Sequence, residues 1–195
     1  CIRLSGPPTG YPGVTVERHS GRFSLDDGRP VELVDLPGTY SLHPTSPDEA
    51  VTRDVVMGRQ TGERRPDALV IVVDAANLDN HLRFAIELIA LGLPCLVALN
   101  MVDLAERDGL TLDAGKLSAA LGVPVVETVA VRRRGLDDLR ALLADAIQTQ
   151  PKPAGDVPDI DPVTLRSRAR AAAKEAVVAE RAVRKTTRMI DSVVL

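Results

Sequence analysis

The sequence contains few aromatic residues and few cysteines. Phe, Trp and Tyr make up 2% of its 195 residues, and Trp is absent. Because hydrophobic residues still account for 45% of the chain, Val, Leu, Ile and Ala must build the core. The two cysteines, Cys1 and Cys95, do not have the spacing of metal ligands. Cys95 lies in an apolar stretch, where we expect a buried, reduced thiol and therefore a reducing compartment.

Long hydrophobic runs and a strong excess of one charge are also missing. No stretch approaches the roughly 18 consecutive apolar residues that a membrane-spanning helix needs, and no signal peptide is visible. The net charge of −3 gives no indication of a nucleic-acid partner. A length of 195 residues suits one globular domain with a small appendage.

The pattern that is present alternates short apolar runs with helical segments. Unbroken runs of Val, Ile and Leu are typical of strands buried on both faces. They occupy residues 31–35, 68–73, 93–99 and 123–126. Helices are expected over residues 47–57, 78–91, 112–121 and 136–147. This alternation predicts an α/β fold with a mostly parallel sheet and helices on both faces, in which ligands bind beyond the carboxyl ends of the strands.

The two ends of the chain differ from this pattern. Residues 14–17 and 21–25 lead into the strand at residue 31 through the hairpin signal Asp-Asp-Gly, so we expect an antiparallel pair at one edge of the sheet. Residues 150–163 contain four prolines and predict a linker. Residues 164–190 are rich in Ala and Arg and predict a helix. Because that helix is too short to hold a core alone, we expect it to pack on something outside this chain.

The first of two short motifs is D-x-x-G, formed by Asp35 and Gly38 directly after a predicted strand. In phosphoryl-transfer proteins an Asp at this place holds magnesium, usually through water. The Gly leaves its backbone N–H free to meet a terminal phosphate. Asp and Gly are also common turn residues, so the motif alone is a weak indication and fits a plain turn as well.

The second motif is N-x-x-D, formed by Asn100 and Asp103 after another predicted strand. An Asp carboxylate can accept hydrogen bonds from the N1–H and the exocyclic amine of guanine. Adenine lacks that amine and would leave the carboxylate unpaired. The Asn amide can reach the guanine N7 and connect neighbouring loops. The alternative is an Asx turn or a helix N-cap.

Together and in this order, the two motifs indicate a GTPase of the Ras-like P-loop class, because a further strand and helix separate them. The sequence then resembles the G domain of bacterial FeoB ferrous iron transporters over residues 4–150 and the last dozen or so. The matching segments are residues 11–17 (YPGVTVE), 35–42 (DLPGTYSL), 73–78 (VDAANL), 98–103 (ALNMVD) and 188–195 (RMIDSVVL).

The resemblance implies GTP or GDP with magnesium as ligands. Thr15 would be the switch I threonine, which binds magnesium and senses the γ-phosphate. Asp35 would hold magnesium through water, and Gly38 would contact the γ-phosphate. Thr39 stands where some GTPases have a glutamine that orients the attacking water, so we expect slow intrinsic hydrolysis.

The resemblance also implies a guanine site. Asn100 and Asp103 would bind the base, with Met101 between them. The last guanine loop of the family would fall on residues 128–131, with backbone N–H groups facing the base oxygen. The nucleotide-binding residues expected in it are Val129, Ala130 and Val131. Ala130 stands where the family usually has serine, so one side-chain contact is lost.

One family element, the phosphate-binding loop, is missing from the sequence. No G-x-x-x-x-G-K-[ST] occurs, and in the family this loop would lie upstream of Cys1. We therefore expect residues 1–149 to be a G domain that lacks its first strand and phosphate loop. Such a chain should bind nucleotide poorly and hydrolyse little, because the loop supplies a lysine and a cradle of N–H groups. The part after residue 150 is also shorter than the helical domain usual in the family.

Two functions remain open. The first is a switch GTPase at the cytoplasmic face of the bacterial inner membrane. It would control iron passage through its own transmembrane domain downstream of Leu195, towards which residues 164–195 would lead. The second is a degenerate, non-hydrolysing interaction domain, against which the intact Asp35, Asn100 and Asp103 argue. A GTPase of translation or RNA modification shares the general motifs but not residues 11–17 and 39–42. The sequence leaves a homo-oligomer open.

Overall fold

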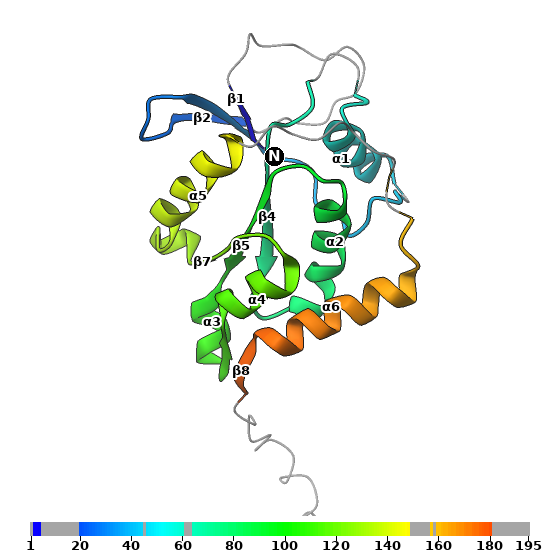
Figure 1. Cartoon of the computed structure of the whole chain (residues 1–195), viewed down its shortest axis with the longest axis vertical. Coiled ribbons are helices and arrows are strands. Elements are labelled where there is room, and N and C mark those ends of the chain that lie inside the picture. Colours follow the sequence, from blue (N-terminus) through cyan, green and yellow to red (C-terminus); the bar gives the residue numbers. More distant parts are fainter. Residues whose placement is uncertain are drawn as a thin grey trace, which may run out of the picture.

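The computed structural model describes residues 2–4, 20–44, 46–60, 64–148, 157 and 159–180. Figure 1 shows strands flanked by helices, in the alternating order that the sequence predicts. The elements are β1 (Ile2–Leu4), β2 (Ser20–Ser24), β3 (Pro30–Val34), α1 (Pro47–Met57), β4 (Leu69–Asp74), α2 (Leu78–Ala90), β5 (Cys95–Asn100), α3 (Val102–Arg107), β6 (Leu110–Leu112), α4 (Ala114–Leu121), β7 (Val125–Thr128), the 3-10 turn η1 (Ala130–Arg132), α5 (Leu136–Gln148), α6 (Pro162–Ala176) and β8 (Val177–Glu180).

Three strands form a parallel sheet in the order β4-β5-β7. The register pairs Asp74 with Asn100, and Asn100 with Thr128. All three strands therefore end side by side, as expected for a parallel sheet whose carboxyl ends carry polar residues.

A second sheet is antiparallel, in the order β1-β3-β2. The expected hairpin between β2 and β3 is confirmed: Gly28 has a φ of 83°, and its N–H donates to the Leu25 carbonyl oxygen at 2.9 Å. Residues 14–17, which were expected to precede this hairpin as part of the edge, lie outside the described residues. Among the described strands, β4 pairs only with β5.

Helices cover both faces of the parallel sheet, as predicted. In Figure 1, α5 lies on one side of β4 and β5, and α2 lies on the other. Side-chain alternation explains this arrangement, since Leu69, Ile71 and Val73 of β4 belong to the cluster around α2. Leu96 of β5 belongs instead to the cluster containing Leu143 of α5. Both clusters are built from aliphatic side chains, as the shortage of aromatic residues requires.

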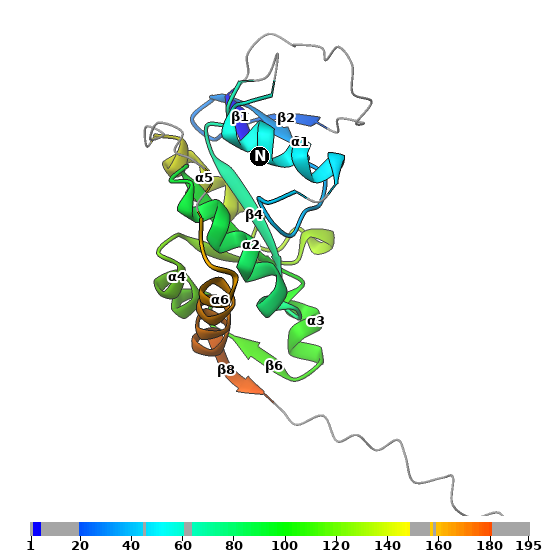
Figure 2. The same ribbon diagram turned by 90° about the vertical axis from the view of Figure 1, so that its right-hand side faces the viewer.

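The C-terminal part corrects two expectations. The helix predicted over residues 164–190 is wrong in extent, because α6 ends at Ala176 and β8 follows it directly. β8 pairs with β6 in an antiparallel ribbon, visible at the lower end of Figure 2. The prediction that this helix packs outside the chain is also wrong. The apolar face of α6 packs on α2 and α4. This face consists of Leu165, Ala169, Ala172, Ala173 and Ala176.

No helix among the described residues is both long enough and apolar enough to cross a bilayer.

Candidate functional site

The end of β5 has an unusual backbone conformation at Met101. Its φ of 61° and ψ of 31° place it in the left-handed region of backbone conformations, which residues other than glycine and asparagine rarely adopt. Helix α3 starts at the next residue, and Asp103 lies in its first turn with a side chain that is 18% exposed. The strained turn therefore places Asn100 and Asp103 on either side of Met101 at the sheet edge, as residues of functional sites often are.

The Asn100 side chain connects β5 to the segment after β7. Its Oδ1 accepts hydrogen bonds from the Ala130 backbone N–H and from the Thr128 hydroxyl, both at 3.2 Å. Thr128 is only 2% exposed, and its hydroxyl also lies 3.4 Å from the Leu99 carbonyl oxygen. The structure thus brings N-x-x-D together with the loop at residues 129–131, as the sequence predicts.

The loop at residues 129–134 is closed by backbone contacts. The Val129 N–H donates to the Arg134 carbonyl oxygen at 3.1 Å, and an isolated β-bridge joins the same two residues. Val131 is 93% exposed, so its side chain adds no packing. The Val129 and Ala130 N–H groups, expected to face a base oxygen, are thus engaged by Arg134 and Asn100 in this structure.

Arg132 contacts the carboxylate of Asp103. Its Nη2 lies 3.6 Å from Asp103 Oδ2, and the Arg132 side chain is 72% exposed. An ion pair with a 3.6 Å separation and one partner this exposed contributes little to stability. A ligand with two N–H donors could therefore displace Arg132 from the carboxylate at small cost.

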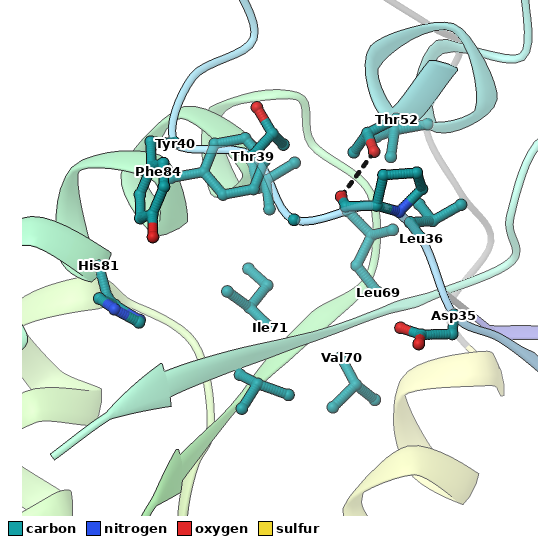
Figure 3. Close-up of a pocket in the computed structure, with 15 residues that line it drawn as sticks. Asp35, Leu36, Thr39, Tyr40, Thr52, Leu69, Val70, Ile71, His81 and Phe84 are labelled. Atoms are coloured by element: carbon teal, nitrogen blue, oxygen red, sulfur yellow. Dashed lines mark hydrogen bonds between the residues drawn. The ribbon is translucent and has the colours of Figure 1, made fainter. Parts of the chain in front are cut away.

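The D-x-x-G segment forms a separate part of the candidate site. Residues 35–40 border a cavity of about 310 Å³ whose other walls are β4, α1 and α2 (Figure 3). The Thr52 hydroxyl of α1 donates to the Pro37 carbonyl oxygen at 2.9 Å. The Thr39 hydroxyl donates to the Ser41 carbonyl oxygen at 2.9 Å, which turns it back onto its own loop.

Asp35 is exposed, and no donor or cation among the described residues reaches its carboxylate. The described residues contain no group of three or more His, Cys, Asp or Glu that could hold a metal ion. Magnesium in phosphoryl-transfer sites needs only one or two carboxylates, because phosphate oxygens and water supply the other ligands. Asp35 is therefore compatible with a magnesium ion whose other ligands are phosphate oxygens and water.

The predicted residues fall into two clusters. Asn100, Asp103 and the loop at 129–131 form one, and residues 35–39 form the other. Among the described residues, no hydrogen bond or ion pair joins the two clusters. Thr15 lies outside the described residues.

Sequence reasoning missed three residues that shape these clusters. Arg132, Thr52 and Glu87 act through contacts across the fold. Glu87 alone had a local signal, because it interrupts the buried stretch Ala85, Ile86 and Leu88 of α2.

Known proteins resemble this chain. The family described as ferrous iron transport protein B matches residues 8–143. The Fe(2+) transporter FeoB of Escherichia coli K12 is 44% identical over 134 residues, which are 67% of this chain and 17% of that protein. The chain thus spans about a sixth of the length of this curated relative.

Solved structures support the same comparison. A GDP-bound point mutant of S. thermophilus NFeoB is 38% identical, with a TM-score of 0.62, and the match covers 82% of this chain and 59% of that one. The cytosolic domain of T. maritima FeoB in its GMPPNP form has a TM-score of 0.74 at 22% identity, with 86% and 88% covered. At this lower identity the likeness shows the fold alone. The Ras-like GTPase fold predicted from the sequence is therefore confirmed.

Proposed function

This chain belongs to the ferrous iron transport protein B family, and on that premise we propose that it is a guanine-nucleotide-binding domain that regulates ferrous iron transport. The main support for the proposal is the bridge from Asn100 to Thr128 and Ala130. It assembles N-x-x-D and the loop at residues 129–131 into one site at the carboxyl edge of a parallel sheet. The GDP and GMPPNP forms of the structural relatives agree with it.

In the proposed site, Asp103 recognises guanine by accepting hydrogen bonds from N1–H and the exocyclic amine. Guanine would replace Arg132 on that carboxylate, since the Arg132 side chain is exposed and lies 3.6 Å from it. Asn100 keeps the loop in place through Oδ1, so its amide group remains available as a donor to N7. Met101, Val129, Ala130 and Val131 would line the base.

On the phosphate side, the proposal assigns Asp35 and Thr15 to magnesium, and Gly38 to the γ-phosphate. Bound magnesium would neutralise charge that develops on the phosphate oxygens. Asp35 is suited to this role because no group in the described structure competes for its carboxylate. Gly38 has open space around its Cα, with no atom within 4 Å of an added Cβ, so its N–H can approach a phosphate. Thr39 is turned back onto Ser41, which agrees with slow intrinsic hydrolysis.

The β4 edge supports the proposal that a strand and the phosphate loop, supplied from upstream of Cys1, complete the domain. Val72 lies in the middle of β4 yet is 60% exposed, whereas its neighbours Ile71 and Val73 are 6% and 0% exposed. An added strand would pair with the edge of β4 that no described strand occupies, and the helix after the loop would cover Val72. Residues 1–149 would then be the G domain, residues 150–163 a linker, and residues 164–195 the connection to a transmembrane domain at the cytoplasmic face of the inner membrane.

The proposal is tested by calorimetric titration of GDP and ADP into this chain and into a version extended upstream to include the phosphate loop. We expect the extended version to bind GDP in preference to ADP and this chain to bind poorly. Asp103→Asn in the extended version should remove the preference, because the amide replaces one of the two acceptor oxygens by an NH2 donor, which faces one of the guanine donors. If neither version binds GDP, the interaction-domain alternative replaces the proposal.

A further inference from the structure

The segment after D-x-x-G is attached to helix α2 by a buried carboxylate. Glu87 is 5% exposed, and its Oε2 accepts a hydrogen bond from the Leu42 backbone N–H at 2.8 Å. The Ser41 hydroxyl lies 3.5 Å from Glu87 Oε1. Leu42 is itself 1% exposed, so its N–H has no access to water as an alternative partner.

Burying a carboxylate is costly unless its oxygens are hydrogen-bonded. No cation among the described residues pairs with Glu87. Arg83 lies one turn earlier on α2, but its buried Nε has no hydrogen-bond partner. The loop donors are therefore the compensation for the buried charge. An apolar side chain would be the ordinary choice at this position of α2, between Ile86 and Leu88.

The same helix holds the loop at a second point. Tyr40 and His81 of α2 stack edge to face, with ring centroids 6.3 Å apart and an interplanar angle of 79°. Tyr40 is 71% exposed, so this contact is open to solvent, whereas the Glu87 contact is enclosed. Helix α2 thus fixes the residues on both sides of Ser41, which lies three residues after Gly38 and two after Thr39.

We propose that Glu87 is a positioning residue whose carboxylate anchors residues 41–42 to α2 and thereby holds Gly38, with Thr39 beside it, where Gly38 would meet the terminal phosphate. This inference rests on the proposed function, since it deepens the role of the same loop. Glu87 does not contact the nucleotide. It acts through the backbone of Leu42.

Amide hydrogen exchange tests the anchor in this chain without any nucleotide. In the native chain, the Leu42 amide should exchange about 10- to 100-fold more slowly than that of exposed Tyr40, in line with a hydrogen bond to a charged group. Glu87→Met keeps the volume and removes the acceptor, so it should abolish this protection while leaving Val97 and Leu99 of β5 protected. Glu87→Gln keeps one carbonyl oxygen as an acceptor and should restore the protection of the Leu42 amide. Equal exchange of Leu42 and Tyr40 in the native chain would overturn the anchor, even if the Met variant did not fold.

Nucleotide binding to the upstream-extended version tests the positioning role. Glu87→Met should weaken the binding of GMPPNP by about tenfold and leave the affinity for GDP within about twofold of the native value, because only GMPPNP presents a γ-phosphate to Gly38. Glu87→Gln should behave like the native protein. Equal weakening of both nucleotides would show a merely structural residue and refute the inference. If the native extended version bound no guanine nucleotide, the proposed function would fail, while the exchange experiment would still decide whether the anchor exists.

Discussion

Gly135 offers the sharpest mutational test of how the loop at residues 129–134 is held. Its φ is +77°, and a Cβ added to it would overlap the backbone carbonyl oxygen of Glu127 and lie 3.3 Å from Thr128 Cγ2. Gly122, at the end of α4, has a φ of +73° and no atom within 4 Å of an added Cβ. Replacing each by alanine therefore separates the cost of the left-handed backbone from the cost of the overlap.

The magnitudes follow from these two terms. Alanine in the left-handed region costs about 1–2 kcal/mol, which is all that Gly122→Ala should lose. Gly135→Ala carries the same cost plus about 1–3 kcal/mol for overpacking. The upper part of that range applies, because Glu127 is held in β7 by its pairing with Leu99 of β5. We expect a total of about 3–5 kcal/mol for Gly135→Ala.

Urea unfolding followed by far-ultraviolet circular dichroism measures both variants, and it suits a chain that lacks Trp. Amide exchange at Val129 and Ala130 gives a local measurement. Gly135→Ala should raise exchange at both positions, because the movement that relieves the overlap displaces the loop, and Gly122→Ala should not. If the two variants lost the same stability, the overlap would be relieved without cost and the reasoning would be refuted.

Two further predictions concern single side chains. Asn100→Ala should lower the free energy of unfolding by about 1–3 kcal/mol, because two acceptor contacts are lost. Asn100→Asp keeps an acceptor oxygen at this position, so it should lose less than half of the stability that Asn100→Ala loses in urea unfolding. Equal losses in the two variants would contradict the bridge from Asn100 to Thr128 and Ala130. Cys95 is 7% exposed, and burial raises the pKa of its thiol to about 11, so in a Cys1→Ser background iodoacetamide at neutral pH should label it only after unfolding. Because the unfolded thiol ionises first, folded stability should fall as pH rises from about 9 to about 11, and Cys95→Ala should lack that part of the fall.

Local sequence patterns are enough to specify the α/β alternation and the strand ends that carry the candidate site. Unbroken aliphatic runs of this length are typical of buried strands, and a parallel sheet brings their carboxyl ends to one edge. That is why the sequence alone predicts that Asn100 and Asp103 lie at this edge, and why the structure places Asn100 between Asp74 and Thr128. The hairpin at Gly28 was equally local, because its signal lies within the turn itself.

Contacts between distant segments depend instead on how the whole chain folds. The Ala-rich composition after residue 164 favours a helix, but it does not show that α6 packs on α2 and α4. It also does not show that the chain turns into β8 at Val177, because the β6 partner lies more than 60 residues earlier. Likewise, Glu87 and Leu42 are separated by 45 residues. Local periodicity determines which face of an element is apolar, whereas the partner of that face, and the polar groups enclosed with it, are set by packing between elements that are far apart in the sequence.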